Sequence, residues 1–252
     1  MMRKWSLFFV LALTTVLLSG CLYPEEEKVE SQVPDEEQLA SVQKAVEEFQ
    51  ADTGVLPIKT RDMDTDQFIK YPIDFEKLIP KYLTKPPANS YEKGGLFQYI
   101  IWNPEVNPTV KLVDLRTAET IRELNIGFMG TFYPTFKEQI SDYIYSIDYK
   151  KLGYKEDLSV PSPYSNNLLP LIVTTEGEVY IDYSVDLKLF IDNNQLTPKE
   201  GEDIRMLLVD AYPVVPAYSL PYTVNEKNEP IFMYDPTAQK VEEQEPTTEE
   251  NS

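Results

Sequence analysis

Apolar residues recur along the chain at two spacings, which predict separate helices and strands. Between residues 35 and 52 the apolar positions are three or four residues apart, as on one face of a helix. These positions are Leu39, Val42, Val46 and Phe49. Asp35, Glu36 and Glu37 fall in the first turn of this helix, where negative charge favours the helix dipole. Gly54 and Pro57 are expected to end it.

The same patterns predict the remaining elements. Further helices are expected at 75–82, 117–125, 136–149 and 198–211. The last two begin with capping-box patterns, Thr135 to Glu138 and Thr197 to Glu200. Strands are expected at 97–102, 109–115, 168–174, 179–183, 187–191, 214–218 and 230–234. Helices followed by strands in both halves predict an α+β fold, with helices packed on small antiparallel sheets in two lobes or in one domain.

The first twenty residues have the pattern of a signal peptide. Arg3 and Lys4 precede an apolar run of about fourteen residues, which is shorter than the roughly twenty that span a bilayer. The next residues, Leu18-Ser19-Gly20-Cys21, resemble the lipobox of bacterial lipoproteins. This resemblance implies cleavage before Cys21 and attachment of a diacylglyceryl lipid carrying palmitate-type chains to that cysteine. The alternative, an uncleaved anchor helix with an incidental cysteine, leaves the domain on the same side of the membrane.

These patterns divide the chain into five parts. We expect a signal peptide, a lipidated tether, an N-terminal α+β lobe, a C-terminal α+β lobe and a disordered acidic tail. Their ranges are 1–20, 21–34, 35–128, 129–235 and 236–252. The tether and the tail are polar and acidic, which does not favour a packed core.

Two absences exclude several chemistries. Cys21 is the only cysteine, so lipidation leaves the mature chain without a thiol, a disulfide or a cysteine ligand for zinc. The chain has no histidine, which removes serine–histidine catalysis, histidine-ligated zinc and the usual proton shuttle near neutral pH. The sequence therefore predicts no cofactor and no metal site, and favours a non-enzymatic protein.

Charge narrows the range of partners. The chain has 42 acidic and 23 basic residues, and cleavage removes two basic residues and no acidic one, so the mature net charge is −21. A field of that sign repels phosphate backbones and anionic headgroups. Nucleic-acid binding and electrostatic docking on the membrane are therefore not expected, whereas basic proteins and loosely held divalent cations remain open.

Three groups of residues carry candidate chemistry. Asp62, Asp64 and Asp66 alternate as at the start of a calcium loop, but Gln67 and Ile73 stand where an EF-hand needs glycine and glutamate. We interpret them as a solvated acidic loop, with a weak cation site as the alternative. A carboxylate-pair glycosidase is permitted by Glu176, Glu178, Asp182 and Asp186, although a structural role is favoured. Five tyrosines suited to stacking on sugars are more typical of a core: Tyr143, Tyr145, Tyr149, Tyr154 and Tyr164.

Phe49, Asp52, Gly54 and Pro57 have a characteristic spacing at the end of the first predicted helix. Through this spacing, residues 44–115 resemble the globular head of type II secretion pseudopilins, in which such a turn ends a long helix. The following loop and first strand are also similar, through Leu78-Ile79-Pro80-Lys81-Tyr82-Leu83, Pro86-Pro87 and Phe97-Gln98-Tyr99. A lipobox and a hydrophilic tether replace the apolar helix of pseudopilins, so the resemblance implies only a similar head. The chain as a whole resembles the YphF-like lipoproteins of Bacillus-type bacteria, which implies a location and no activity.

Together these features predict a lipoprotein held at the outer face of the cell membrane by lipid on Cys21. The domain is expected to be a non-enzymatic binding or interaction module whose partner is an envelope protein or a cell-wall component. A solute-binding lipoprotein is the first alternative, and a carboxylate-dependent glycan hydrolase is the second.

Overall fold

The structure is a computed structural model, and it describes residues 35–63, 65–131 and 133–237. The expected signal peptide, Cys21, the tether and residues 238–252 of the expected tail lie outside the described residues. Within the described ranges, no helix combines the length and the hydropathy needed to cross a bilayer.

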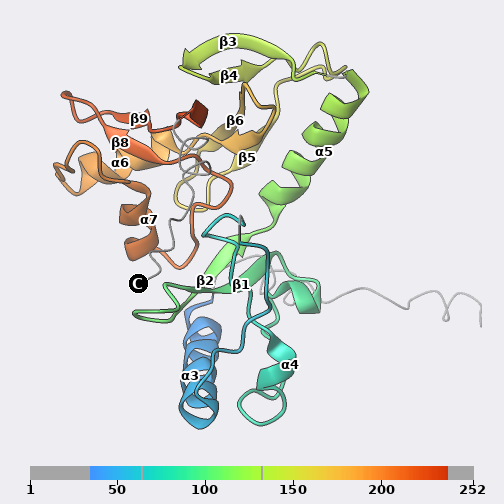
Figure 1. The fold of residues 1–252 in the computed structure, drawn as a ribbon, viewed down its shortest axis with the longest axis vertical. Helices are drawn as coiled ribbons and strands as arrows, with labels where there is room; N and C mark the ends of the chain where they lie inside the picture. Colours follow the sequence, from blue (N-terminus) through green and yellow to red (C-terminus); the bar gives the residue numbers. More distant parts are fainter. Residues whose placement is uncertain (1–34, 64, 132, 238–252) are drawn as a thin grey trace, which may run out of the picture.

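The described elements form an α+β fold (Figure 1). The helices are α3 (Glu36–Thr53), α4 (Phe75–Leu78), α5 (Arg116–Thr131), α6 (Ser184–Asn193) and α7 (Arg205–Ala211), with a 3-10 helix, η1 (Tyr91–Lys93). The strands are β1 (Phe97–Trp102), β2 (Thr109–Asp114), β3 (Phe136–Ser141), β4 (Ile144–Ile147), β5 (Ser159–Pro161), β6 (Leu168–Thr174), β7 (Val179–Ile181), β8 (Tyr222–Val224) and β9 (Pro230–Phe232). They pair as β1–β2, as β8–β9 and as a sheet ordered β3–β4–β6–β5, in which β7 also pairs with β6, and every pair is antiparallel.

Helix α3 forms where its apolar spacing predicted. Asp35 caps its start by accepting a hydrogen bond from the Gln38 backbone N–H at 2.9 Å. Gly54 ends it with a φ of 75°, a left-handed conformation that glycine adopts without a steric penalty. The buried face of α3 packs on the β1–β2 hairpin, so the first predicted helix is confirmed with its core-facing residues.

The β1–β2 hairpin is covered on both faces, because successive strand residues point to opposite sides. One face, which includes Tyr99 and Leu112, packs against α3 and α4. The other face, which includes Ile100 and Val113, packs against Phe68 and against residues of the 209–217 segment. Figure 1 shows the hairpin between α3 and α4 on one side and the rest of the chain on the other. We call residues 35–115 the first region and residues 116–237 the second region.

A larger core lies in the second region. The buried face of α5 (Ile121, Leu124 and Phe128) packs together with residues of β4, β6, β7, α6 and β8. Helix α5 is longer than the one or two turns predicted at 117–125, and it ends beyond residue 128, where the sequence divided the two lobes.

The helix predicted at 136–149 is wrong, because this segment forms the β3–β4 hairpin. Tyr143, with a φ of 64°, lies in the turn between the strands. Ile144 and Ile147 are buried in β4, which pairs with β3 on one side and with β6 on the other. Thr135 donates its hydroxyl to the Asp148 carbonyl across the hairpin instead of capping a helix. Pairing with β6 thus outweighs a local pattern that suits a helix.

Other boundaries also differ from the expectations. The strand predicted at 187–191 is wrong: this stretch lies in α6, where Leu187 and Ile191 are four residues apart on one buried face. Helix α7 begins at Arg205 instead of residue 198, and its buried face includes Leu208 and Val209. Residues 214–218 form no strand and contribute only an isolated bridge between Val214 and Leu112. Helix α4 stops at Leu78, whereas the strands predicted near 97, 109, 168, 179 and 230 are confirmed.

Candidate functional site

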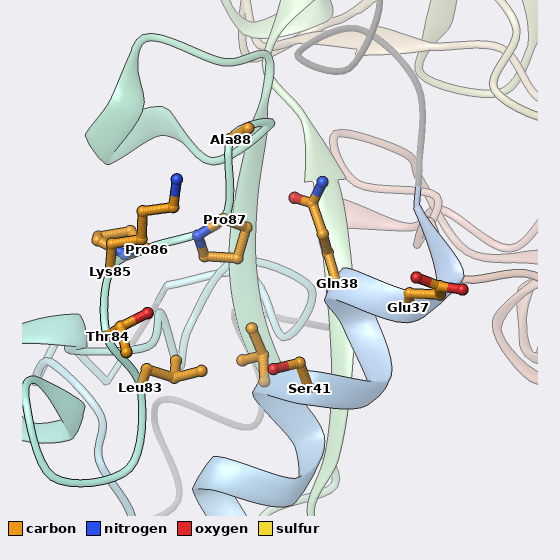
Figure 2. Close-up of a pocket in the computed structure, with 10 residues that line it drawn as sticks. Glu37, Gln38, Ser41, Leu83, Thr84, Lys85, Pro86, Pro87 and Ala88 are labelled. Carbon is orange, nitrogen blue, oxygen red and sulfur yellow. The ribbon is translucent and has the colours of Figure 1, made fainter. Parts of the chain in front are cut away.

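A groove lies beside the first turns of α3, and its opposite wall is the segment from Leu83 to Ala88 (Figure 2). Its volume is about 340 Å³. The lining residues are Glu37, Gln38, Ser41, Val42, Leu83, Thr84, Lys85, Pro86, Pro87 and Ala88. Both walls therefore belong to the first region.

The proline-containing wall is fixed to the β1 strand by buried polar residues. Asn89 and Ser90 follow the wall directly and are fully buried. The Tyr99 hydroxyl donates to the Asn89 side-chain oxygen at 2.7 Å, and the Phe97 backbone N–H donates to the Asn89 carbonyl at 3.1 Å. Proline also restricts the backbone dihedrals of the wall. These hydrogen bonds hold the residues that follow the wall against β1.

Gln38 supplies an acceptor that is not used within the described part of the chain. Its Nε2 donates to the Asp35 carboxylate at 3.1 Å, whereas its buried Oε1 has no hydrogen-bond partner among the described residues. Figure 2 shows Gln38 and Pro87 on opposite walls of the groove. A buried acceptor left unpaired costs free energy, so a donor brought by a ligand would stabilise the complex.

The groove has the chemistry of a binding surface. Leu83 and Pro86 are partly exposed and provide apolar contacts, and Glu37 and Lys85 place one negative and one positive side chain on the exposed rim. A glycosidase needs two carboxylates on either side of one bond. The groove contains one carboxylate, so its residues suit recognition better than that reaction.

The four predicted acidic candidates do not converge on this groove. The Asp186 carboxylate is buried and accepts hydrogen bonds from the hydroxyls of Ser162 (2.7 Å) and Ser165 (2.6 Å), which ties the loop before β6 to α6. Asp182 accepts from the Tyr222 hydroxyl at 2.9 Å. Both carboxylates hold the second region together.

Glu176 and Glu178 also bond to tyrosines of the second region. The Tyr234 hydroxyl donates to Glu176 at 3.1 Å, and the Tyr180 hydroxyl donates to Glu178 at 2.7 Å. Burial of the Tyr180 side chain and its bond to Glu178 both raise the pKa of the tyrosine well above its ordinary range. These contacts support the structural role favoured for the acidic residues.

The aspartates of the calcium-like pattern are only partly described, because Asp64 lies outside the described residues. Asp66 accepts a hydrogen bond from the Phe68 backbone N–H at 2.8 Å, which shapes the turn before the buried Phe68. Among the residues that the structure places, no group of three or more acidic side chains is arranged to hold a metal ion.

The predicted tyrosines contribute mainly to packing. Tyr164 contacts the rings of Tyr183 and Tyr212, with centroids 5.8 and 5.0 Å away, and its hydroxyl donates to the Val214 carbonyl at 3.1 Å. Burial of this hydroxyl raises the pKa of Tyr164 well above its ordinary value. Tyr149 and Tyr154 contact each other edge to face, Tyr145 packs on Phe136, and Tyr143 packs on a small core around Ile144.

Sequence reasoning identified the elements around the groove but not the groove itself. The start of α3 and the Pro86-Pro87 pair were both recognised, yet more than forty positions separate them along the chain. Only the packing of α3 on β1–β2 brings them together. Nothing at Gln38 itself distinguishes it in the sequence from the other polar residues of the helix.

Residues 35–114 match the family model of the YphF family N-terminal domain. The match covers nearly all of the first region and includes every residue that lines the groove. This part of the chain is therefore YphF-like, in agreement with one of the resemblances found in the sequence. No curated protein and no solved structure gives a match to the chain.

Proposed function

We propose that this chain is an envelope lipoprotein, anchored by lipid on Cys21, whose domain is a non-enzymatic binding module. Its groove beside α3 binds an extended segment of another envelope protein at the outer face of the cell membrane. The observation that carries this proposal is the unused buried acceptor Gln38 Oε1 in a groove with apolar walls and a charged rim.

An extended peptide has the groups that this groove lacks. A backbone N–H of the peptide would donate to Gln38 Oε1, and an apolar side chain would pack against the partly exposed Leu83 and Pro86. Glu37 and Lys85 on the rim would favour particular charges in the partner and so contribute selectivity. The acidic surface outside the groove favours a partner with a basic flank.

The two alternatives receive less support. A solute receptor needs a cleft that encloses its ligand, whereas the first and second regions are joined by packing and by hydrogen bonds between Leu112 and residues 213–215. A glycan hydrolase needs facing carboxylates, whereas the groove and the pockets beside α5 and α6 each have one acidic residue in their walls. The binding module therefore remains the leading proposal.

The anchor is tested by the substitution Cys21→Ala in the full chain. We expect labelled palmitate to be incorporated into the unsubstituted protein and not into the variant. The matched control is Ser19→Ala, which keeps the cysteine and a small residue before it, and should retain the label. Equal labelling of the Cys21→Ala variant would contradict the proposed attachment site.

The groove is tested by placing an arginine in it. Ser41→Arg puts a long side chain into the groove, whereas Ala40→Arg puts the same side chain on an exposed position that does not line it. After crosslinking in intact cells and purification from membranes, the unsubstituted protein and Ala40→Arg should recover the same partner, and Ser41→Arg should lose it. Binding to a glycan array without any reproducible protein partner would contradict the proposal.

A further inference from the structure

The last turns of α5 and the residue just beyond them carry an exposed apolar patch. The side chains of Ile126, Met129 and Tyr133 are 57%, 77% and 78% exposed, respectively. We call these three residues the α5 tip patch. They are spaced three and four positions apart, so Ile126 and Met129 share one side of the helix and Tyr133 continues the spacing past its end. The tip of α5 is one of the outermost parts of the molecule (Figure 1).

The patch is not an extension of the core. Ile121, Leu124 and Phe128, on the opposite side of α5, are buried against the strands of the second region. Near its end the helix is therefore apolar on both its inner and its outer side. A surface helix normally has polar residues on its outer side, and an apolar outer side indicates a second contact.

The surrounding sequence lacks charge. No charged residue occurs from Leu124 to Phe136, although charged residues make up 26% of the chain. Glu123 and Lys137 are the charged residues on either side of this stretch. A protein partner of ordinary surface chemistry would be met by some charged side chains, whereas this stretch has none, and its Thr131 and Thr135 hydroxyls already donate to backbone carbonyls.

We propose that the α5 tip patch inserts into the interfacial layer of the lipid bilayer. Tyrosine and other amphipathic aromatic residues are favoured at that level, where the ring contacts acyl chains and the hydroxyl stays hydrated. The absence of charge matters because the chain as a whole is acidic and is repelled by anionic headgroups. The stretch from Leu124 to Phe136 therefore brings no charge of its own to the membrane, and the exposed Arg122 and Glu123, one turn before Ile126, carry opposite charges.

The length of chain before α3 permits this contact. This step rests on the proposed attachment of lipid to Cys21. Thirteen residues separate Cys21 from Asp35, and an extended chain of that length spans at most roughly 43–47 Å. A flexible tether of that length lets the domain rotate beside the bilayer that holds the lipid, so that the α5 tip can be turned toward it.

Two contacts with one bilayer would orient the domain. A lipid anchor alone leaves the domain free to rotate on its tether. A second, weak contact becomes effective because the anchor keeps the tip at high local concentration near the surface. Insertion of the tip would hold the domain in one orientation relative to the membrane.

The test uses a tryptophan reporter in the full chain, purified with its lipid and placed in phosphatidylethanolamine–phosphatidylglycerol vesicles that contain brominated acyl chains. Met129→Trp puts the reporter in the patch, and Val106→Trp puts it at a position that is 83% exposed in the β1–β2 turn. Trp102 is common to both chains and Trp5 lies in the expected signal peptide, so the unsubstituted protein supplies the background. We expect emission from Met129→Trp to shift to shorter wavelength and to be quenched several-fold more than that from Val106→Trp.

A second pair of variants tests the patch itself. In the Met129→Trp chain, Ile126→Glu should abolish most of the quenching, whereas Val55→Glu, at a residue that is 60% exposed beyond the end of α3, should leave it unchanged. Equal quenching of the two reporters overturns the proposal. So does a blue shift of Met129→Trp without vesicles together with a doubled molecular mass, which would assign the patch to a second copy of the chain.

The lipid anchor and the insertion of the patch are measured separately. Mass spectrometry reports whether Cys21 carries lipid. A Cys21 without lipid would contradict the proposed anchor but would not test the insertion of the tip. In that case the same reporters are measured after the chain is added to the vesicles. Lipid on Cys21 with an unquenched Met129→Trp would contradict only the insertion of the tip.

Discussion

The two regions of this protein bury their strands in different ways. In the first region, a single hairpin, β1–β2, is covered on both faces, by α3 and α4 on one side and by residues of the 209–217 segment on the other. In the second region, the sheet around β6 ends in β3, where four consecutive residues from Lys137 to Ile140 are exposed. The hairpin of the first region is thus covered on both faces, whereas the sheet of the second region ends in an exposed strand.

This difference shows that part of the core of the first region is supplied by residues of the second region. Lys111 donates to the carbonyls of Val209 and Tyr212 at 2.6 and 2.8 Å, and Leu112 forms a parallel bridge with Val214. The family match ends at residue 114, yet the packing around β2 includes residues nearly one hundred positions later. A unit recognised by sequence is therefore smaller than the unit that packs.

The largest expected effect comes from separating the two regions. A chain of residues 35–115 exposes the hairpin face that includes Phe68, Ile100 and Val113, each buried in the complete protein. Exposure of each such side chain costs about 1.5–3 kcal/mol, and small domains are stable by only about 5–15 kcal/mol. We expect this fragment to show no cooperative transition in urea, whereas the complete chain does. A sharp transition of the fragment alone would mean that the first region folds independently.

A smaller effect is expected within the wall of the groove. At Gly95, an added Cβ would lie 2.2 Å from the Asn89 carbonyl carbon, so Gly95→Ala forces the backbone next to the groove to move. Overpacking of this kind costs about 1–3 kcal/mol. The free energy of unfolding, measured in urea, should fall by that amount, and the partner bound by the groove should be captured less well.

The control for Gly95→Ala is Gly127→Ala in α5, where the added Cβ would lie 3.6 Å from the nearest atom, a Leu152 side-chain carbon. This variant should fold with no loss of stability. If both variants behave alike, the close approach of Gly95 to Asn89 does not constrain the wall.

The sequence predicted the first region better than the second, for a physical reason. The apolar face of α3 has a helical spacing, and the strands predicted at 97–102 and 109–115 are short runs joined by a connector that contains two prolines. From Phe136 to Ile147 the apolar spacing suits a helix as well, and only the neighbouring β6 decides that the segment forms strands. Single-sequence patterns contain no information about that neighbour.

The candidate groove was beyond sequence reasoning for a related reason. Its two walls, at Gln38 and at Pro87, are distant in sequence and meet only through the packing of α3 on β1–β2. The acidic residues that the sequence singled out were easier to interpret, because a structural role was already favoured for them. Asp186, held by two serine hydroxyls, agrees with that role.

The hydrogen bonds that join the two regions at Lys111 can be removed without exposing the core. Lys111→Met keeps the apolar stem but removes the two hydrogen bonds to the end of α7. Bonds from a charged donor contribute about 1.5–3 kcal/mol each, and relief of the desolvated charge offsets part of their loss. We expect a net loss of about 1–2 kcal/mol in the free energy of unfolding at pH 7.

The pH dependence of this difference provides a second readout. Desolvation lowers the pKa of Lys111 in the folded protein, so the unfolded chain binds more protons at this residue between the lowered pKa and about 10.4. The free energy of unfolding therefore rises with pH across that window as Lys111 loses its proton. Below the window Lys111 is charged in both states, and the cost of burying its charge is present in full. The variant should lack this rise, and identical pH profiles would contradict the assignment.

The smallest effect is expected at Gly130 in the second region, and Gly54 in the first region provides a contrast of opposite sign. Gly130 lies in the last turn of α5, and an added Cβ there meets no atom within 4 Å, so Gly130→Ala should raise the free energy of unfolding by about 0.5–1 kcal/mol through helix propensity. Gly54, at the end of α3, has a φ of 75°, and Gly54→Ala should lower stability by about 1–2 kcal/mol. Urea unfolding of both variants measures the pair. A destabilising Gly130→Ala would show that the last turn of α5 needs the conformational freedom of glycine. Helix propensity would then not explain why this turn is helical.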